Sequence, residues 1–549
     1  MPRAVLRRLS LVLLPIAGGL ALIQPVAGTA TAPSGRPSVS ENLVDLDHNL
    51  KFPQNKQNEA AITRDPVTGV LVVGANDELD NPLCHDPTAP LSSPCPFATG
   101  EQISAFYVSG NGGASWSGGY LPGYDNAGIR RASGGDPSLD SGPSRCPDQR
   151  TFAYRCGVTI YYANLADPIN PDQHFSEAIA VSRTHNDGAT WLAPSVVNAL
   201  DKTSDFDDHE WIAVDKVDIS PYFGRVYLFI AIYCGECSGY GNVKLMVVHS
   251  DDEGVSWSSP VKVSAANNNA AQGFRETGEM TVSADGTVEV FWTENADSPK
   301  LPSLQVVATS KDGGNTFTAP ITIAQVTDYP VRGTPFDVVD LFNRVPGMSA
   351  RVDCYPHPAA DPSSNRVYVV WCDFGGGHGV VKAAVSSDGV NWTALGTVAG
   401  VANSNAFFPQ LSVDPNGVVN LTFDALTAPP AGNPWQTGVQ LYDNYFAQAA
   451  DGATFGPAIQ VSSAHSNPDG SSYNNLMEQF LGDYIGIVSG PHAAYLVWTD
   501  SRNATPCAAV DAYRSAIYAG SKTAVAPNPD KVCARDFGNT DTYEATISY

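Results

Sequence analysis

Basic residues are scarce in this chain. Lysine and arginine together number 31 against 56 aspartates and glutamates, which gives a formal net charge of −25. The electrostatic field of such a protein repels nucleic acids and anionic polymers and favours divalent cations or neutral partners. The composition therefore argues against a nucleic-acid partner, and mildly against an anionic sugar as substrate.

Long apolar runs are missing beyond the N-terminal segment. After about residue 32, no stretch approaches the ~20 apolar residues that a membrane-spanning helix requires. We therefore expect no stable membrane insertion. Apolar residues still make up 43% of the chain, which also contains 49 glycines, so we expect a globular, turn-rich protein.

The N-terminal segment is the exception. An apolar run, Leu9–Val26, follows three arginines and leads to the small residues Ala30-Thr31-Ala32. This is the pattern of a secretory signal peptide with its cleavage site. We predict a signal peptide over residues 1–32, a short linker over 33–41, and a secreted, extracellular protein.

The cysteines lack the arrangement of a zinc or redox site. Cys234-Gly235-Glu236-Cys237 has no second cysteine pair or histidine close to it in sequence, which favours a disulfide in a loop. Cysteines of an exported protein are expected to form disulfides, although spacing alone does not determine their connectivity. The spacing suggests the local pairs Cys84–Cys95, Cys146–Cys156, Cys234–Cys237, Cys354–Cys372 and Cys507–Cys533.

One octapeptide, Ser250–Trp257, recurs along the chain. Six copies, some of them eroded, lie roughly 60 to 75 residues apart, and such a period indicates an array of similar structural units. The other copies are Ser109–Trp116, Asn186–Trp191 (with an insertion after Ser182), Ser310–Phe317, Ser386–Trp392 and Ala450–Phe455.

The chemistry of the octapeptide is that of a hairpin turn. Its Asp or Asn can hydrogen-bond to backbone two residues on, and its glycine supplies the positive φ of a tight turn. The closing Trp or Phe offers a large apolar surface for packing. We interpret each copy as a structural brace between two strands; the alternative is a metal-binding or ligand-binding loop.

This octapeptide resembles the Asp box, also called the bacterial neuraminidase repeat. Over nearly all of its predicted mature length, the chain is similar to the sialidase-like superfamily of β-propeller proteins. The resemblance implies an all-β propeller. Activity has to be argued from the site, because one fold hosts many functions.

The repeating unit also has a first half, ahead of the octapeptide, and this half occurs seven times along the chain. Each consists of an apolar strand, a turn that often contains Asp-Pro, a second apolar strand and an acid. The last unit takes a third strand from Tyr513–Tyr518, and Asn42–Asp47 is an orphan strand that can close the ring. Closure removes exposed sheet edges. We therefore predict one seven-bladed β-propeller over residues 42–549, as a monomer.

The inner strands of a propeller all begin on one face, around the axis. Aligning the seven units places one ring of side chains there and a second ring two residues further on, pointing the same way. The first ring is Glu59, Asp136, His209, Glu279, Tyr355, Phe408 and Gly482. The second ring is Ala61, Ser138, Trp211, Thr281, His357, Gln410 and Tyr484.

Second strands end beside these rings. Their last acids include Asp77, Asp373 and Asp500, and Arg502 follows just beyond. A ring rich in acids and aromatic residues is suited to a glycan, because carboxyl groups perform acid and base chemistry on glycosidic bonds. The alternative is an acidic, water-filled channel mouth that holds a structural divalent cation such as calcium.

The resemblance to sialidases is incomplete at the site. Family members carry Arg-Ile-Pro on the first inner strand, and this chain has Gln57–Ile62 there, without Arg or Pro. The missing arginine is the bidentate clamp for the sialic carboxylate. The resemblance suggests further arginines at Arg351 and Arg502.

By the same resemblance, the nucleophile pair is Tyr484 with Glu279, and the acid is Asp77 or Asp136. Tyrosine needs an adjacent carboxylate because its free pKa is about 10. The candidate substrate contacts on the same face are Glu59, His209, Trp211, Arg351, Tyr355, His357 and Arg502.

Two functions follow from these observations. The first is a secreted glycoside hydrolase with a sialidase-like site that is altered for another oligosaccharide or polysaccharide. The second is a propeller without catalysis that binds glycans or a surface protein. No separate carbohydrate-binding module or cell-wall anchor is visible to decide between them.

Overall fold

The computed structural model describes most of the chain after residue 36. The described residues are 37–45, 49–81, 83–84, 95, 102–123, 125–148, 150–168, 178–197, 205–233, 243–264, 274–295, 302–332, 343–352, 354–428 and 440–549. The predicted signal peptide and the predicted Cys234–Cys237 pair lie outside them.

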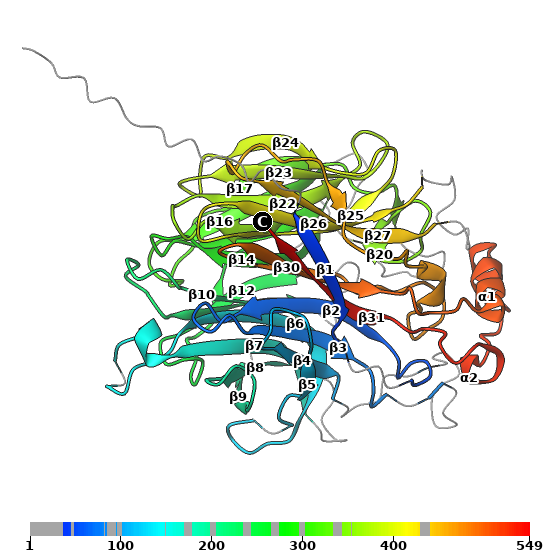
Figure 1. Cartoon of the computed structure of the whole chain (residues 1–549), viewed down its shortest axis with the longest axis horizontal. Coiled ribbons are helices and arrows are strands. Elements are labelled where there is room, and N and C mark those ends of the chain that lie inside the picture. Colours follow the sequence, from blue (N-terminus) through cyan, green and yellow to red (C-terminus); the bar gives the residue numbers. More distant parts are fainter. Residues whose placement is uncertain are drawn as a thin grey trace, which may run out of the picture. The chain divides into compact units, whose positions relative to one another are not determined.

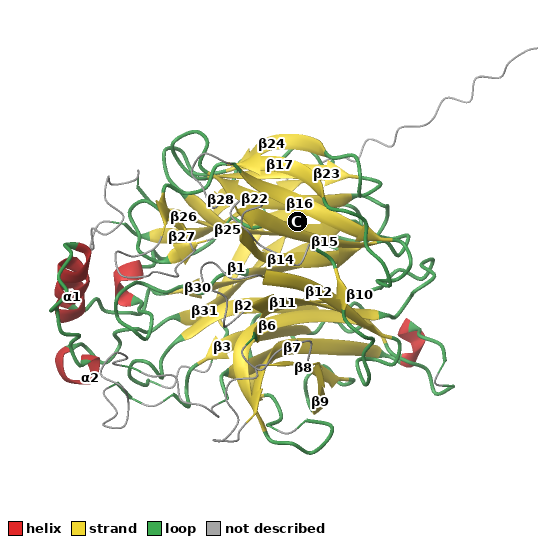
Figure 2. Ribbon diagram, turned by 180° about the vertical axis from the view of Figure 1, so that it is seen from behind, coloured by secondary structure: helices red, strands yellow, loops and turns green. Residues whose placement is uncertain are grey.

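Seven four-stranded antiparallel sheets follow one another through the described residues and form the blades of a β-propeller (Figures 1 and 2). Blade 1 is β2 (Gln57–Arg64), β3 (Leu71–Asp77), β4 (Ser104–Ser109) and β5 (Ser117–Tyr120). Blade 2 is β6 (Arg131–Pro143), β7 (Val158–Pro168), β8 (Ala178–Thr184) and β9 (Leu192–Val197). Blade 3 is β10 (Phe206–Val214), β11 (Val226–Tyr233), β12 (Val243–Ser250) and β13 (Val261–Lys262).

The remaining blades continue the pattern. Blade 4 is β14 (Phe274–Val282), β15 (Val288–Asn295), β16 (Ser303–Ser310) and β17 (Ile321–Val326). Blade 5 is β21 (His357–Ala360), β22 (Val367–Asp373), β23 (Val380–Ser386) and β24 (Thr393–Ala399). Blade 6 is β25 (Ala406–Val413), β26 (Val419–Leu426), β27 (Tyr442–Ala449) and β28 (Ile459–Gln460). Blade 7 is β29 (Gly486–Gly490), β30 (Ala493–Asp500), β31 (Asp541–Ser548) and β1 (Ser38–Leu43).

The N-terminal strand closes the last blade, as predicted, although two details of the prediction were wrong. The strand is β1, which begins four residues earlier than expected and pairs with β31 from Ser38 opposite Ser548 to Leu43 opposite Tyr543. The third strand of blade 7 is therefore β31. The segment that was predicted for this role lies in helix α1 (Ala508–Tyr518).

The helix has a clear physical cause. Val510, Arg514 and Ile517 are its buried residues, and their spacing of four and three puts them on one helical face. The disulfide Cys507–Cys533 links the start of α1 to the end of the short helix α2 (Pro529–Val532). Within the described residues, no helix is long and apolar enough to cross a membrane.

The six copies of the octapeptide connect the third and fourth strands of blades 1 to 6, which confirms that they are hairpin turns. In the copy of blade 3, Ser250 Oγ donates to Asp252 Oδ1 at 2.8 Å and accepts from Gly254 N at 2.8 Å. Asp252 Oδ1 also accepts from Ser256 N at 2.9 Å. In blade 2, Thr184 supplies the equivalent hydroxyl, so that copy has no insertion after Ser182.

Each turn also rests on the preceding blade. Trp257 of blade 3 donates from Nε1 to Ser195 Oγ of blade 2 at 2.9 Å. The ring of Trp392 in blade 5 lies edge-on to Phe291 of blade 4, with centroids 5.6 Å apart. The repeated turn is thus a staple between neighbouring blades, in agreement with its interpretation as a brace.

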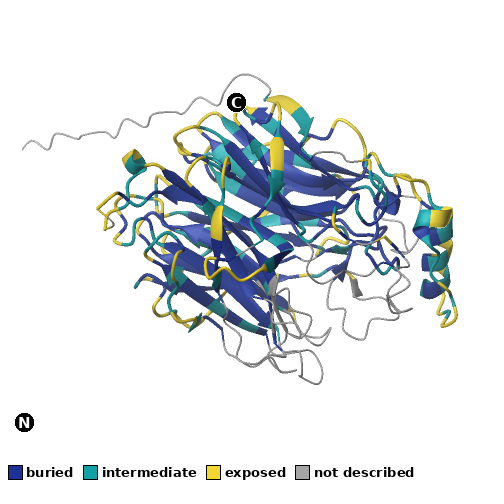
Figure 3. Ribbon diagram, turned by 90° about the horizontal axis from the view of Figure 1, so that it is seen from below, coloured by how far each residue is buried: buried dark blue, intermediate teal, exposed yellow. Residues whose placement is uncertain are grey.

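Buried residues are concentrated in the strands of the blades (Figure 3). All residues of β3, β22 and β26 are buried. This burial on both faces explains their nearly continuous apolar sequences. Cys354–Cys372 and the local pairs Cys84–Cys95 and Cys146–Cys156 are present as predicted. A small sheet of β18 (Val331–Arg332), β19 (Asn343–Arg344) and β20 (Arg351–Val352), which was not predicted, precedes blade 5.

Candidate functional site

The inner strands are irregular where they begin near the axis. A register shift interrupts the pairing in β2 between Asn58 and Ala61, and similar shifts occur in β6, β10, β14 and β25. Ring residues with left-handed backbone lie at several of these positions: Glu59 (φ 56°), Asp136 (54°), His209 (48°) and Phe408 (47°). Such bulges redirect side chains and store of the order of 1–3 kcal/mol of strain at each non-glycine residue.

The predicted alignment of blade 4 was wrong by two residues. Glu279 lies opposite Phe291 in the strand pairing, just as Gln410 lies opposite Thr422 and His357 opposite Val370. Glu279 therefore belongs to the second ring, at the position predicted for Thr281. The cause is the turn after β14, where Ser283 takes the place that Asp215 has in blade 3, and the acid of this turn, Asp285, comes two residues later.

Three carboxyl groups from blades 1, 2 and 3 form a hydrogen-bonded chain, named here the carboxyl chain: Glu59, Asp136 and Asp208. Asn76 of β3 holds its first two members. The Asn76 amide donates to Glu59 Oε2 at 2.6 Å, and its Oδ1 accepts from the backbone N–H of Asp136 at 3.0 Å. The bulges of three neighbouring inner strands thus bring together three acids.

Burial favours the protonated forms of these acids. It raises the pKa of Glu59 from 4.5 to about 7, with a further contribution from Asp483. Burial and then the Glu59 carboxylate raise the pKa of Asp136 well above its usual range, and burial and Asp136 do the same for Asp208. Each of the three carboxyl groups is thus favoured in its protonated form by burial, and a neighbouring carboxylate adds to the effect.

Arg351 provides the positive charge beside the carboxyl chain. Its guanidinium binds Asp483 with two hydrogen bonds, Nε to Oδ1 at 2.7 Å and Nη2 to Oδ2 at 2.6 Å, and lies 4.0 Å from Glu59 Oε1. It also stacks on Phe480, 4.9 Å from the ring centroid. Burial alone would lower the pKa of Arg351, but Asp483 raises it well above the usual value.

Aromatic side chains surround this polar group. The His209 ring lies edge-on to Tyr355 and Tyr484, with centroids 5.2 and 5.9 Å away. Burial, followed by His357, lowers the pKa of His209 to about 3. His209 is consequently neutral at physiological pH.

Within the described residues, no hydrogen bond is found between Tyr484 and Glu279, the predicted nucleophile pair. Tyr484 donates to the Pro137 carbonyl at 3.2 Å. Glu279 Oε1 lies 2.6 Å from His357 Nδ1 and accepts from Gln410 at 3.0 Å. Burial, and then Asp136, raise the pKa of Tyr484 well above 10, which disfavours a phenolate nucleophile.

Three other candidates lie apart from the carboxyl chain. Asp77 accepts hydrogen bonds from Gln57 at 3.2 Å and Tyr107 at 3.0 Å. Arg502 binds Glu41 of β1 at 2.6 Å and Asp500 at 2.7 Å, so its observed partners belong to the closing blade. Trp211 lies one level deeper, on the wall of the axial cavity.

Sequence reasoning missed several members of the site. Asp208 and Glu210 flank the predicted His209, and Asp483 lies between the predicted Gly482 and Tyr484. The acid-rich run before His209 was the available signal. Both carboxylate oxygens of Glu210 are buried without a hydrogen-bond partner, and burial, followed by Asp136, raises its pKa well above the usual range.

In the described part of the chain, no group of three or more His, Cys, Asp or Glu side chains is arranged to hold a metal ion. The site is a set of buried and partly exposed carboxyl groups beside Arg351. Asp136, Asp208, Asp483 and Arg351 are partly exposed, whereas Glu59 is only 2% exposed. Such a set can donate a proton, accept one and hydrogen-bond hydroxyl groups.

No family model matches this sequence, and no curated protein matches it. Similar solved structures include a Dyadobacter fermentans protein of unknown function, with 14% identity and a TM-score of 0.40 over 72% of this chain and 96% of that one. A Trypanosoma rangeli sialidase in complex with sialic acid has 11% identity and a TM-score of 0.40 over 77% and 60%. A Penicillium chrysogenum α-L-arabinanase has 10% identity and a TM-score of 0.37 over 75% and 93%.

These similar structures include sialidases. The strand pairing of this chain itself defines the class of fold, a seven-bladed β-propeller within the described residues.

Proposed function

We propose that this chain is a secreted glycan-active propeller that hydrolyses a neutral oligosaccharide or polysaccharide at the carboxyl chain. The observation that carries the proposal is the group of three acids, Glu59, Asp136 and Asp208, that Asn76 and Arg351 border. Hydrolysis of a glycosidic bond commonly uses one protonated carboxyl group and one carboxylate. This site supplies both at neutral pH.

In this mechanism Asp136 is the general acid. It gives its proton to the glycosidic oxygen as the bond to the anomeric carbon breaks, and Asp208 then resupplies Asp136. Glu59 lies against Asp136 and is only 2% exposed, so it positions the acid and is not the base. The partly exposed carboxylate bound to Arg351, Asp483, takes a proton from the water that attacks the anomeric carbon.

A neutral sugar suits the site better than an anionic one. Asp483 already occupies the guanidinium fork of Arg351. The formal charge of −25 opposes an anionic substrate as well. Ordinary sialidase activity is therefore not part of the proposal.

The test is hydrolysis of a panel of neutral aryl glycosides and plant and microbial oligosaccharides at pH 5 to 8. We expect turnover of at least one substrate, and a loss of about 10²–10⁴-fold in kcat for Asp136→Asn, the usual contribution of a general acid. Asp218→Asn, which removes an exposed carboxylate, is the matched control. Turnover that is unchanged in Asp136→Asn would contradict the mechanism.

The second candidate is a glycan-binding propeller without catalysis. It is favoured by the hydrogen bonds of Tyr484 and Glu279, which go to other partners. Binding of a panel member without turnover, weakened by Asp136→Asn, would support this candidate over the first.

A further inference from the structure

A second cavity lies along the propeller axis, below the candidate site. Its volume is about 410 Å³, and inner strands of all seven blades contribute to its walls. It extends from Trp211, Gln410 and Tyr484 to the turns at Pro66 and Pro415. From Gln410 to the end of β25 at Val413 the strand rises about 10 Å, and the turn at Pro415 lies beyond it.

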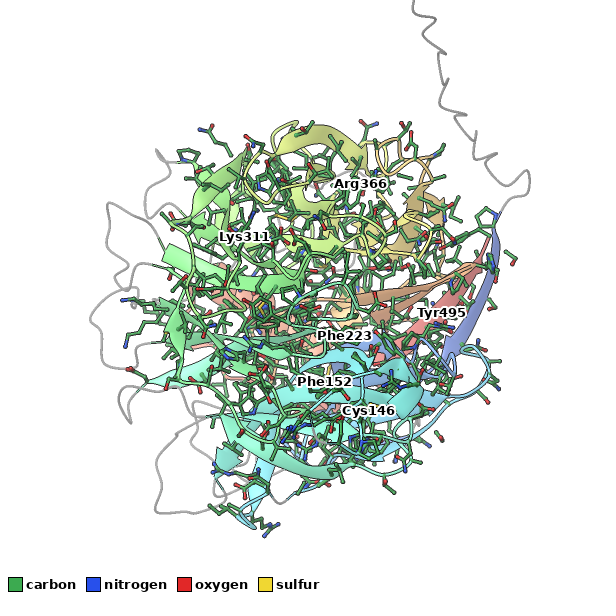
Figure 4. All side chains as sticks on the ribbon, turned by 90° about the vertical axis from the view of Figure 1, so that its left-hand side faces the viewer. Cys146, Phe152, Phe223, Lys311, Arg366 and Tyr495 are labelled. Carbon is green, nitrogen blue, oxygen red and sulfur yellow. A yellow bond between two sulfur atoms is a disulfide. The ribbon has the colours of Figure 1, made fainter. Side chains whose placement is uncertain are left out.

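None of the acids of the carboxyl chain lines this cavity. At the near end, Gln410 is bound to Glu279, which is fully buried, and Tyr484 is bound to the Pro137 carbonyl. At the far end, turn residues such as Pro66 and Pro415 place the mouth on the face where the repeated turns lie. Figure 4 views that face, on which Lys311 and Arg366 are labelled.

The walls of the cavity are mainly apolar. They include Ile62, Leu139, Ile212, Met280 and Leu411, one from each of five blades. A sugar would leave hydroxyl groups unpaired against such walls, which costs free energy. The volume lies within the range of about 300–1,000 Å³ that is typical of small-molecule sites.

Two cations, Arg64 and Lys216, and one acid, Asp140, are the charged residues that line the cavity. Arg64 lies at the end of β2, and its guanidinium has no hydrogen-bond or ion-pair partner within the described residues; its Nε is also buried. Lys216 lies at the same mouth and pairs with Asp140. One cationic charge is thus left uncompensated beside an apolar shaft.

We propose that this cavity binds a single-chain amphipathic carboxylate, with its alkyl chain between the inner strands and its carboxylate on Arg64. Burial of the chain removes apolar surface from water, at about 25 cal/mol per Å². The carboxylate supplies the charge-assisted hydrogen bonds that Arg64 lacks. The site is independent of the proposed glycan chemistry.

The experiment is calorimetric titration of the full mature protein with dodecanoate at pH 7.5, below its micelle concentration. We expect saturable binding that Arg64→Gln weakens about tenfold or more, since hydrogen bonds to charged groups contribute ~1.5–3 kcal/mol. Arg150→Gln, at an exposed arginine elsewhere, is the matched control and is expected to bind like the native protein. Dodecyltrimethylammonium, with the same chain and the opposite charge, should bind at least tenfold more weakly.

A second variant tests the shaft itself. Thr281 is partly exposed and lines the cavity, so Thr281→Phe should fill it and abolish dodecanoate binding without lowering the thermal midpoint by more than a few degrees. If that variant fails to fold, the dodecanoate titration of Arg64→Gln tests the proposal instead. Absence of binding, equal binding of the cationic amphiphile, or binding unchanged in Arg64→Gln would overturn the proposal.

Discussion

Replacing Glu59 by glutamine should change how the stability of the protein depends on pH. Burial raises the pKa of Glu59 from 4.5 to about 7 in the folded protein. Between these values the folded state binds more protons than the unfolded state, so stability falls as pH rises through this window. A shift of about 2.5 pH units corresponds to about 3 kcal/mol.

The variant lacks this titration. Between pH 5 and pH 8, its free energy of unfolding should therefore fall by about 3 kcal/mol less than that of the native protein. Loss of the Glu59 charge also lowers the pKa of Asp136, which flattens the curve further. His209 acts in the opposite direction: its pKa of about 3 means that stability is lost as pH falls below its ordinary 6.5. That contribution is common to both proteins and cancels in their difference.

The assay is urea unfolding followed by tryptophan fluorescence at pH 5, 6, 7 and 8. Asp218→Asn, at an exposed carboxylate, is the control, and its curve should run parallel to that of the native protein. The reasoning would be refuted if Glu59→Gln also ran parallel, or lost more stability than the native protein as pH rises.

The remaining predictions concern the staples of the propeller. Trp257→Ala should lower the free energy of unfolding by about 2–3 kcal/mol, less than a fully buried tryptophan would, because the side chain is half-buried. Thermal melts measure this, with the exposed Val255→Ala in the same turn as control; lost ligand binding at intact stability would contradict the brace. Arg502→Ala should cost about 3–5 kcal/mol, because it leaves Glu41 and Asp500 unpaired at the closing blade. In a double-mutant cycle with Glu41→Gln the losses should not add; additive losses would show that the ion pair does not fasten the closing strand.

Local patterns in the sequence determined much of the fold. The six octapeptides predicted their hairpin turns because serine, aspartate and glycine complete that turn with their own hydrogen bonds. Seven first halves predicted seven blades, and spacing predicted the four disulfides that the described residues contain. Glu59, Asp136 and His209 were found because each begins an aligned apolar strand.

Other features depend on contacts between distant segments, which no local pattern reports. Alternation alone did not distinguish a strand from the helix α1, whose face is defined by what Val510 and Ile517 pack against. The register of β14 against β15 decided that Glu279 meets His357.

Only the closed ring brings Asp208 to Asp136 and Arg351 to Asp483, residues that are 72 and 132 positions apart. The sequence thus determined the repeating unit, because the unit is stabilised by neighbours along the chain. The tertiary structure decided the site, because its charges and pKa values arise from burial and from residues of different blades.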